Sequence, residues 1–249
     1  MDDPYDLFSS YYRELIISTG HLKKEQEVVK KLLLEINVKN DACILDAACG
    51  TGNLLQFLMT EGYKNVWGLD SSQGMINRAE EISTNNKLTC TKWENMNLLK
   101  HFWNKFDLIF ILSISLPHAE ESNLPLIFDN ILKCLKPGGM LIFDNREWIY
   151  DKRNRLIEPN RPIGKFRFLQ AIQKHGKSYL IYDMCRYTNR QYIKYRIMDS
   201  VSSRKIDIGV SYLIKLSSEY LPILLDVGFS DALYQSIDGW PYQIILAKN

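Results

Sequence analysis

A short stretch near the start of the chain constrains its fold more strongly than any other. Residues 43–55 have the pattern of an apolar strand, an acidic residue, a turn with Gly50 and Gly52, and the start of a helix. The two glycines permit positive φ and let backbone N–H groups approach a ligand without an intervening side chain. A second apolar strand ends at Asp70, 20 residues after Gly50. An acid at this distance is expected to bind the hydroxyls of a ribose, so the stretch predicts a nucleoside-binding α/β fold.

The alternation of strands and helices predicts a doubly wound, mostly parallel sheet with its ligands at the carboxyl ends of the strands. The clearest strand, 106–112, is nearly continuous in apolar residues, which is typical of a strand buried on both faces. Two last strands, near 232–236 and 243–247, would close a seven-stranded sheet. The other strands are expected over 43–46, 66–70, 88–93 and 140–143.

The segments before and after this region have a different character. Residues 1–35 contain an aromatic-rich helical segment that either closes over the site as a lid or simply packs against the domain. Residues 150–216 contain three β-prone stretches joined by polar turns, which predicts an antiparallel β insertion on the substrate side. We expect one domain over 1–249, because a chain of this length usually buries a single α/β core.

Composition excludes several classes of function. Hydrophobic residues make up 46% of the chain and charged residues 24%, which is ordinary for a globular protein. The net charge of +2 gives no basic face for nucleic acid, and no apolar run reaches the roughly 18 residues of a membrane span. The acidic N-terminus lacks an apolar signal region, so we expect a cytoplasmic protein without a nucleic-acid or membrane partner. The five cysteines show no C-x-x-C pair, which predicts free thiols and no metal site.

Four motifs, in this order, resemble those of the class I S-adenosylmethionine-dependent methyltransferases. They are 44–52, 68–70, 106–109 and 135–139, and their spacing matches over about residues 40–145. NAD-dependent enzymes usually have a third glycine in the turn, where this chain has Leu55. The resemblance implies a Rossmann-like methyltransferase that uses S-adenosyl-L-methionine and releases S-adenosyl-L-homocysteine.

The resemblance also implies roles for residues on the donor side. Asp46 would hold the ammonium of the methionine part, directly or through water, and Asp70 would accept both ribose hydroxyls. Met75 and Met96 would enclose the adenine while Asn95 binds its edge. Alternatively, Met75 packs within its helix and Asn95 is a solvated loop amide. The implied cofactor-binding set is Asp46, Ala48, Gly50, Gly52, Asn53, Asp70, Ser71, Met75, Glu94, Asn95, Met96 and Leu112.

Beyond residue 140 the chain is more specifically similar to the glycine/sarcosine N-methyltransferases. The similar pieces are 112–118, 144–148 and 239–243. The resemblance implies that Arg146 pairs with the carboxylate of an amino-acid substrate, since its planar fork suits that group. The alternative is a surface ion pair between Arg146 and a neighbouring acid, Asp144 or Glu147. The implied methyl acceptor is glycine, sarcosine or a related amino acid or amine.

The acceptor side departs from that family at one position. Ile114 stands where the family has an asparagine that faces the reacting amine, which weakens the case for glycine itself. His118 matches the family's histidine, either as a base or as a structural residue bonded to a backbone carbonyl. Arg146, His118 and Tyr12 form the predicted catalytic set. Other tyrosines that could line the path of the methyl group are Tyr5, Tyr11, Tyr182, Tyr187 and Tyr195.

Two other functions are compatible with these motifs. A nucleotide-aminosugar N-methyltransferase of natural-product biosynthesis has a similar Tyr-Asp-Leu-Phe segment and a strand-rich insertion, and it would not need Arg146. A non-catalytic cofactor-binding regulator would need only the first half of the chain. DNA methylation is not expected, because the loop after residue 112 lacks the Asn/Asp-Pro-Pro-aromatic motif of DNA amino-methyltransferases. The sequence also allows a homo-oligomer.

Overall fold

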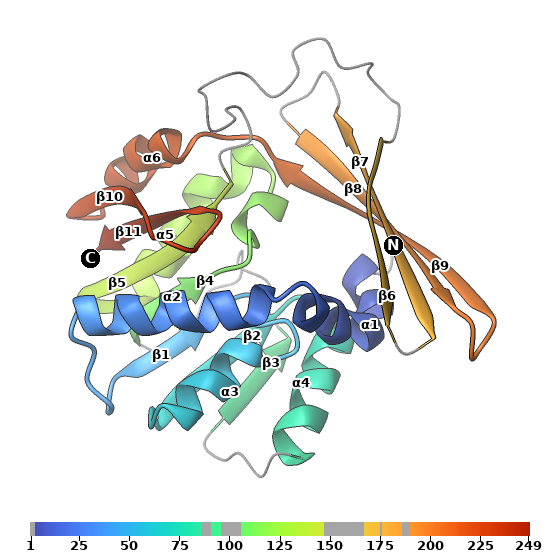
Figure 1. The fold of residues 1–249 in the computed structure, drawn as a ribbon. Helices are drawn as coiled ribbons and strands as arrows, with labels where there is room; N and C mark the ends of the chain where they lie inside the picture. Colours follow the sequence, from blue (N-terminus) through green and yellow to red (C-terminus); the bar gives the residue numbers. More distant parts are fainter. Residues whose placement is uncertain (1–2, 86–90, 96–105, 147–166, 175, 186–189) are drawn as a thin grey trace.

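In the computed structural model, the main body is a seven-stranded sheet in the order β10-β11-β5-β4-β1-β2-β3 (Figure 1). The structure describes residues 3–85, 91–95, 106–146, 167–174, 176–185 and 190–249. Neighbouring strands from β5 to β3 are parallel, whereas β11 runs antiparallel to both β5 and β10. The strands are β1 (Cys43–Asp46), β2 (Asn65–Asp70), β3 (Thr91–Asn95), β4 (Phe106–Ile111), β5 (Leu135–Asn145), β10 (Asp231–Ser236) and β11 (Gln243–Lys248). The predicted Rossmann-like, mostly parallel sheet is confirmed.

Helices cover both faces of this sheet. α2 and α3 pack on one face, and α5 and α6 pack on the other. Successive strand residues point to opposite faces, so Ile44 packs with the first pair of helices and Leu45 with the second. Burial on both faces explains the nearly continuous apolar strands. The helices are α1 (Pro4–Ser18), α2 (His21–Glu35), α3 (Asn53–Thr60), α4 (Gln73–Asn85), α5 (Leu124–Cys134) and α6 (Tyr220–Val227), with short 3₁₀ turns η1 (Leu116–His118), η2 (Glu121–Asn123) and η3 (Ser217–Glu219).

The fifth strand begins earlier than the sequence predicted. It starts at Leu135, which pairs with Phe106, rather than near residue 140. The last residue of the chain extends the pairing, because Gly138 N–H donates to the Asn249 carbonyl (3.1 Å) and Asn249 N–H donates to the Gly139 carbonyl (2.9 Å). The hydrogen bonds to Asn249 therefore pair Gly138 and Gly139 as part of a strand, where the sequence predicted a turn.

A separate antiparallel sheet in the order β6-β7-β8-β9 forms the described part of the predicted insertion. Its strands are β6 (Arg167–Lys174), β7 (Lys177–Cys185), β8 (Arg190–Asp199) and β9 (Arg204–Leu213). The sequence did not predict β6, because its residues mix polar and apolar side chains. They form a strand because they pair with β7. The beginning of the predicted insertion, up to residue 166, lies outside the described residues.

α1 lies between the main body and the second sheet (Figure 1). It packs closely on α4, where a Cβ on Gly74 would come within 2.8 Å of the Asp6 Cα. On the other side, Glu14 accepts hydrogen bonds from Lys177 Nζ (2.7 Å) and the Tyr179 hydroxyl (3.1 Å) of β7. α1 is therefore fixed from both sides, and the lid function of residues 1–35 stays a prediction. No helix in the described ranges has the length and apolar character needed to cross a membrane.

Candidate active site

A cavity of about 1000 Å³ lies at the carboxyl ends of the parallel strands, under α1 and beside the second sheet. The glycine loop after β1 lines one end of the cavity, which we call the donor end. The turn after β4 and strand β9 line the other end, which we call the acceptor end. Eight residues of the predicted catalytic and cofactor-binding sets line this cavity: Tyr12, Ala48, Gly50, Asp70, Ser71, Met75, His118 and Arg146.

The remaining predicted residues lie nearby or cannot be placed. Four belong to the same strand ends and loops without lining the cavity: Asp46, Gly52, Asn53 and Leu112. Glu94 and Asn95 lie in β3 next to β2, but their side chains are outside the described residues, and so is the whole of Met96.

The glycine loop is held by the acid at the end of the neighbouring strand. Gly50 has φ 52° and Gly52 has φ 75°, in the left-handed region that glycine occupies without strain. Gly50 N–H donates to Asp70 Oδ2 (2.8 Å), and Ser72 N–H donates to Asp70 Oδ1 (2.9 Å). A carboxylate has about four acceptor sites, so one such group can accept from backbone N–H groups and from ligand hydroxyls. Asp70 can therefore shape the loop and bind ribose hydroxyls together.

Two carboxyl groups at the donor end have raised pKa values. Burial raises the pKa of Asp70 to about 6, and the N–H groups of Ser72 and Gly50 oppose this shift. Burial also raises the pKa of Asp46 well above its ordinary value, and the nearby Glu25 carboxyl adds to the shift. A bound cation would offset the cost of ionising these buried acids. The donor end is thus suited to a positively charged ligand.

Tyr12 and Asn53 connect α1 to the glycine loop. A Cβ on Gly50 would lie 3.6 Å from the Tyr12 ring, so Tyr12 covers the loop. Asn53 accepts a hydrogen bond from Arg13 and donates to Thr51 Oγ1 (3.0 Å). Tyr12 therefore stands at the donor end, whereas the Asn53 amide ties α1 to the start of α3.

The start of α4 is fastened to α1 by two aspartates. Asp6 accepts hydrogen bonds from Ser72 Oγ (2.6 Å) and Gly74 N–H (2.8 Å). The Ser71 hydroxyl, predicted to bind the cofactor, donates to Asp3 (3.1 Å). These bonds hold the N-terminal segment across the region where a nucleoside bound to Asp70 would lie.

The acceptor end is organised around His118, which follows the turn after β4. Its Nδ1 lies 2.9 Å from the Ser211 carbonyl oxygen of β9, so Nδ1 carries a proton and donates it. Nε2 is then an acceptor, and the Tyr5 hydroxyl donates to it at 2.9 Å. Burial lowers the pKa of His118 to about 4, so the imidazole is neutral at pH 7. His118 thus has both features that the sequence offered as alternatives: Nδ1 is bonded to a backbone carbonyl, and Nε2 can accept a proton.

Tyr5, rather than Tyr12, contacts this histidine. The sequence included Tyr5 among several tyrosines without ranking it, and nothing local could rank it, because the partners lie 113 residues apart. Tyr212, which was not predicted, also lines the cavity beside Tyr195, whereas Tyr11 does not. The Tyr182 side chain and the whole of Tyr187 lie outside the described residues.

Arg146 lines the cavity directly after β5. Its guanidinium donates to the Tyr242 hydroxyl (3.1 Å) and lies 5.2 Å from the centre of that ring. Both oxygens of Asp144 accept backbone N–H groups of the turn after β4. Glu147, the other acid offered as a partner for Arg146, lies outside the described residues.

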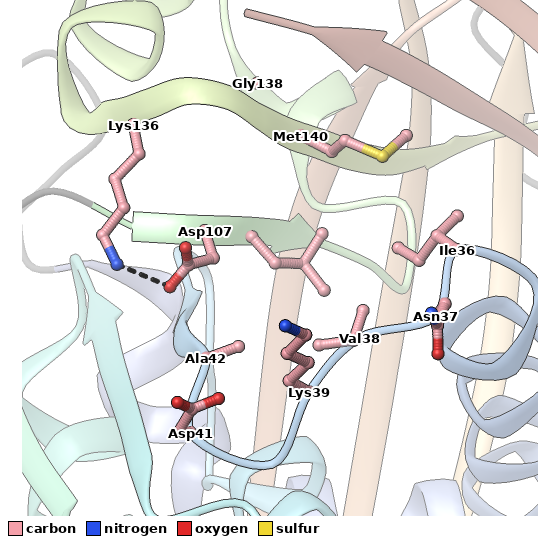
Figure 2. A pocket seen from close by; sticks show the side chains of 11 residues that line it. Ile36, Asn37, Val38, Lys39, Asp41, Ala42, Asp107, Lys136, Gly138 and Met140 are labelled. Atoms are coloured by element: carbon pink, nitrogen blue, oxygen red, sulfur yellow. Dashed lines mark hydrogen bonds and ion pairs between the residues drawn. The ribbon is translucent and has the colours of Figure 1, made fainter.

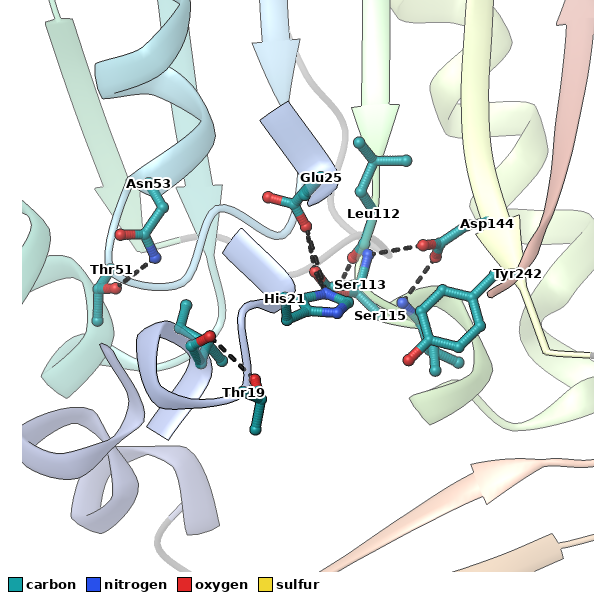
Figure 3. A network of polar contacts seen from close by, with 12 residues as sticks. Thr19, His21, Glu25, Thr51, Asn53, Leu112, Ser113, Ser115, Asp144 and Tyr242 are labelled. Atoms are coloured by element: carbon teal, nitrogen blue, oxygen red, sulfur yellow. Dashed lines mark hydrogen bonds and ion pairs between the residues drawn. The ribbon is translucent and has the colours of Figure 1, made fainter. Parts of the chain in front are cut away.

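A buried acid that the sequence did not indicate adjoins the same turn (Figure 3). Glu25 of α2 accepts a hydrogen bond from the Ser113 hydroxyl, and His21 Nε2 lies 3.0 Å from that oxygen. Burial raises the pKa of Glu25 to about 7 and lowers that of His21 to about 4. Glu25 resembles the other charged residues of its helix in sequence and lies 88 residues from Ser113, so no local pattern marks it.

A smaller cavity of about 400 Å³ opens at the opposite, amino edge of the sheet (Figure 2). Its charged lining includes Lys39, Asp41, Asp107 and Lys136. Asp107 accepts hydrogen bonds from Lys136 Nζ (2.7 Å) and Cys43 N–H (2.7 Å). These bonds join the beginnings of β1, β4 and β5, so Asp107 has a structural role at the amino edge.

Comparison with known proteins agrees with the geometry of the larger cavity. The family described as "methyltransferase domain" matches residues 44–139, which include the glycine loop, Asp70 and the turn after β4. This match covers less than half of the chain. The resemblance to S-adenosylmethionine-dependent methyltransferases is confirmed.

Relatives match either this domain or the whole chain. A Geobacillus relative is 32% identical over 142 residues, which is 56% of this chain and 56% of the relative, so the match spans about half of each. The phosphoethanolamine N-methyltransferase of Plasmodium falciparum is 25% identical over 247 residues, covering 98% of this chain and 86% of that protein. The glycine N-methyltransferase of Mus musculus is 30% identical over 134 residues, covering 48% and 45%.

Solved structures match this fold over nearly the whole chain. An S-adenosylmethionine-dependent methyltransferase from Clostridium acetobutylicum has a TM-score of 0.75 at 21% identity and covers 99% of both chains. An amino pentose methyltransferase from Micromonospora echinaspora, solved with S-adenosylmethionine bound, has a TM-score of 0.70 at 17% identity and covers 95% of both. These proteins use the cofactor that the sequence motifs predicted.

The donor end fits this cofactor on its own chemistry. Asp70 offers acceptors for a ribose, and the buried Met75 presents an apolar surface beside it. Gly50 leaves room for close backbone approach, and the raised pKa values of Asp46 and Asp70 favour a cationic ligand. These side chains therefore match a nucleoside that carries a sulfonium and an ammonium.

Proposed function

We propose that this protein transfers the methyl group of S-adenosylmethionine to the nitrogen of a small amine. The observation that supports this most directly is that the glycine loop with Asp70 and the Tyr5–His118 pair line one cavity. When bound, S-adenosylmethionine supplies a methyl group already activated by its positively charged sulfur. The protein then mainly has to align donor and acceptor, and alignment of this kind contributes roughly 7–11 kcal/mol.

On the donor side, the proposal assigns holding roles to residues of the glycine loop and α4. Asp70 would hold the ribose hydroxyls, and Met75 would pack against the adenine. The backbone from Ala48 to Gly50 would approach the methionine part, with Asp46 beneath it. The predicted roles of Glu94 and Asn95 belong to the same proposal, since β3 is the strand next to β2.

On the acceptor side, Tyr5 and His118 form a path for a proton. A protonated amine can pass its proton to the Tyr5 oxygen while the Tyr5 hydroxyl passes its own proton to Nε2 of His118. Because the pKa of His118 is about 4, this transfer is uphill and the protonated imidazole is short-lived. The nitrogen lone pair is then available to accept the methyl group. The Ser211 carbonyl keeps the proton on Nδ1 and so keeps Nε2 as the accepting atom.

Arg146 favours an acceptor that carries an acidic group. Its guanidinium lines the cavity, and a planar fork suits either a carboxylate or a phosphate. Two of the relatives named above are methyltransferases of phosphoethanolamine and of glycine, and each of these amines carries such a group. Ile114 presents an apolar side chain to the cavity, which favours an acceptor with more carbon than glycine. The proposed acceptor is therefore an amine linked to a carboxylate or phosphate, such as sarcosine or a related compound.

A screen of glycine, sarcosine, phosphoethanolamine and aminosugars, with mass detection of methylated products, tests this proposal. Arg146→Ala should raise the KM of the acidic acceptor by about 10–100-fold, because a charged hydrogen-bonding partner is lost. The affinity for S-adenosylhomocysteine should stay within about twofold. Arg196→Ala is the matched control, because Arg196 pairs with Asp207 on the second sheet instead. An equal loss of donor affinity in Arg146→Ala would place this residue in support of the fold.

Tyr5→Phe tests the proton path. Loss of the hydroxyl should lower kcat by about 100-fold, with little change in donor affinity, because general acid–base transfer contributes effects of this size. Tyr11→Phe is the control, since Tyr11 is a buried tyrosine of the same helix that does not line the cavity. Equal kcat values for the two variants would remove Tyr5 from the mechanism.

A second candidate is an aminosugar N-methyltransferase. The observation that favours it is the match to the amino pentose methyltransferase over 95% of each chain, which includes the second sheet. An aminosugar acceptor would be methylated equally well by the wild type and Arg146→Ala. Binding of S-adenosylhomocysteine without transfer to any amine would instead indicate a cofactor-binding regulator.

A further inference from the structure

The turn after β4 has an unusual backbone. Ser113 and Ile114 are successive non-glycine residues with φ 60° each. L-residues avoid this region because Cβ comes too close to the backbone, and a β-branched residue such as isoleucine avoids it most strongly. A strained conformation of this kind persists only where the surrounding structure imposes it.

Three side chains from distant parts of the chain impose it here (Figure 3). The Ser113 N–H donates to Asp144 Oδ2 (3.0 Å), and the Ile114 N–H donates to Asp144 Oδ1 (2.6 Å). The Ser113 hydroxyl is bonded to Glu25, and His21 Nε2 lies 3.0 Å from it. Glu25 and Asp144 are both buried, so water does not compete for these bonds.

The strained turn lies where the donor and acceptor parts of the cavity meet. Both of its residues line the cavity, and β4 is the strand between β1, which leads to the glycine loop, and β5, which leads to Arg146. The Ile114 side chain packs in the cluster that contains Phe8 of α1 and Met75 of α4. The chain then continues into η1, where the His118 N–H donates to the Ser115 carbonyl (3.2 Å).

We propose that Ser113 is a positioning residue, which holds the strained turn so that Ile114 and His118 align the acceptor nitrogen with the donated methyl group. The proposal rests on the proposed function, because it concerns the same transfer. Its physical basis is that a turn fixed by two buried acids cannot relax when the acceptor binds. Glycine at this position would remove the strain and would also allow the turn to adopt other conformations, which would lower the rate of transfer.

Two substitutions separate strain from hydrogen bonding. Ser113→Ala and Ser113→Gly both lose the hydroxyl, but only glycine also relieves the strain at positive φ. We expect Ser113→Gly to melt about 2–4 °C higher than Ser113→Ala. We also expect its kcat to be at least about tenfold lower than that of Ser113→Ala, with S-adenosylhomocysteine affinity equal in the two variants.

Ser203 provides a matched control. It is an exposed serine with φ 54° in the turn between β8 and β9, and it does not line the cavity. Ser203→Gly should also melt above Ser203→Ala, but kcat should be the same for both. Equal melting temperatures for Ser113→Gly and Ser113→Ala would overturn the proposal, and so would equal kcat values. Failure of the proposed function is distinct, because the wild type would then transfer no methyl group to any amine.

Discussion

The two edges of the main sheet carry aspartates in opposite electrostatic states. At the amino edge, burial alone would raise the pKa of Asp107, but hydrogen bonds from Lys136 and the Cys43 N–H lower it below its ordinary value. At the carboxyl edge, burial raises the pKa of Asp70 to about 6 and that of Asp144 to about 7. The same side chain is thus stabilised as an anion at one edge and penalised at the other.

The difference lies in the partners that the chain gives to each acid. Lys136 balances the charge of Asp107 within the chain. The bonds described above to Asp70 and Asp144 come from neutral backbone N–H groups, and Arg146 lowers the pKa of Asp144 without cancelling the effect of its burial. A cationic ligand at the donor end would stabilise the ionised form of Asp70. We therefore expect substitutions at the two edges to affect different properties.

The largest difference in donor affinity is expected between the variants Asp70→Asn and Asp107→Asn. Loss of the Asp70 charge should weaken S-adenosylhomocysteine binding by about 100-fold, because charge-assisted bonds to the ribose become neutral ones. Asp107→Asn should leave the affinity within about twofold and lower the melting temperature by about 2–4 °C. Calorimetric titration and thermal unfolding measure the two effects. Comparable losses of affinity in both variants would break the distinction between the edges.

The pH dependence of donor binding should give a smaller effect. Asp70 has a pKa of about 6 in the unliganded protein, so most of it is protonated at pH 5. Only the ionised carboxylate accepts both hydroxyls, so binding should tighten as pH rises and should change by about tenfold between pH 5 and pH 7.5. Asp70→Asn should flatten this dependence, whereas Asp107→Asn should retain it. A flat wild-type profile would show that the Asp70 charge does not matter for binding.

Lys136→Gln should give the smallest effect. The Lys136–Asp107 pair has side chains that are 44% and 39% exposed, and exposed ion pairs contribute less than about 1 kcal/mol. Urea unfolding should therefore show only a small loss of stability, similar to that of Lys133→Gln, which breaks another surface pair. A loss of more than about 2 kcal/mol would mean that the amino edge depends on this lysine more than its exposure indicates.

The donor half of the site could be predicted from the sequence because its contacts are local in topology. β1 and β2 are consecutive strands and parallel neighbours, so their carboxyl ends must meet. A spacing of 20 residues between Gly50 and Asp70 therefore corresponds to a direct bond. The same reasoning located Arg146 at the end of β5, although it could not identify Tyr242 as its partner.

The sequence by itself determined the fold class and the approximate positions of the parallel strands, because strand periodicity encodes them locally, and its motifs implied the donor through their resemblance to known methyltransferases. The tertiary structure alone decided which tyrosine meets His118 and which acids hold the Ser113–Ile114 turn. Those contacts join residues 113, 88 and 31 positions apart. The first two contacts depend on how α1 and α2 cross the carboxyl edge of the sheet, and no local pattern specifies such a crossing.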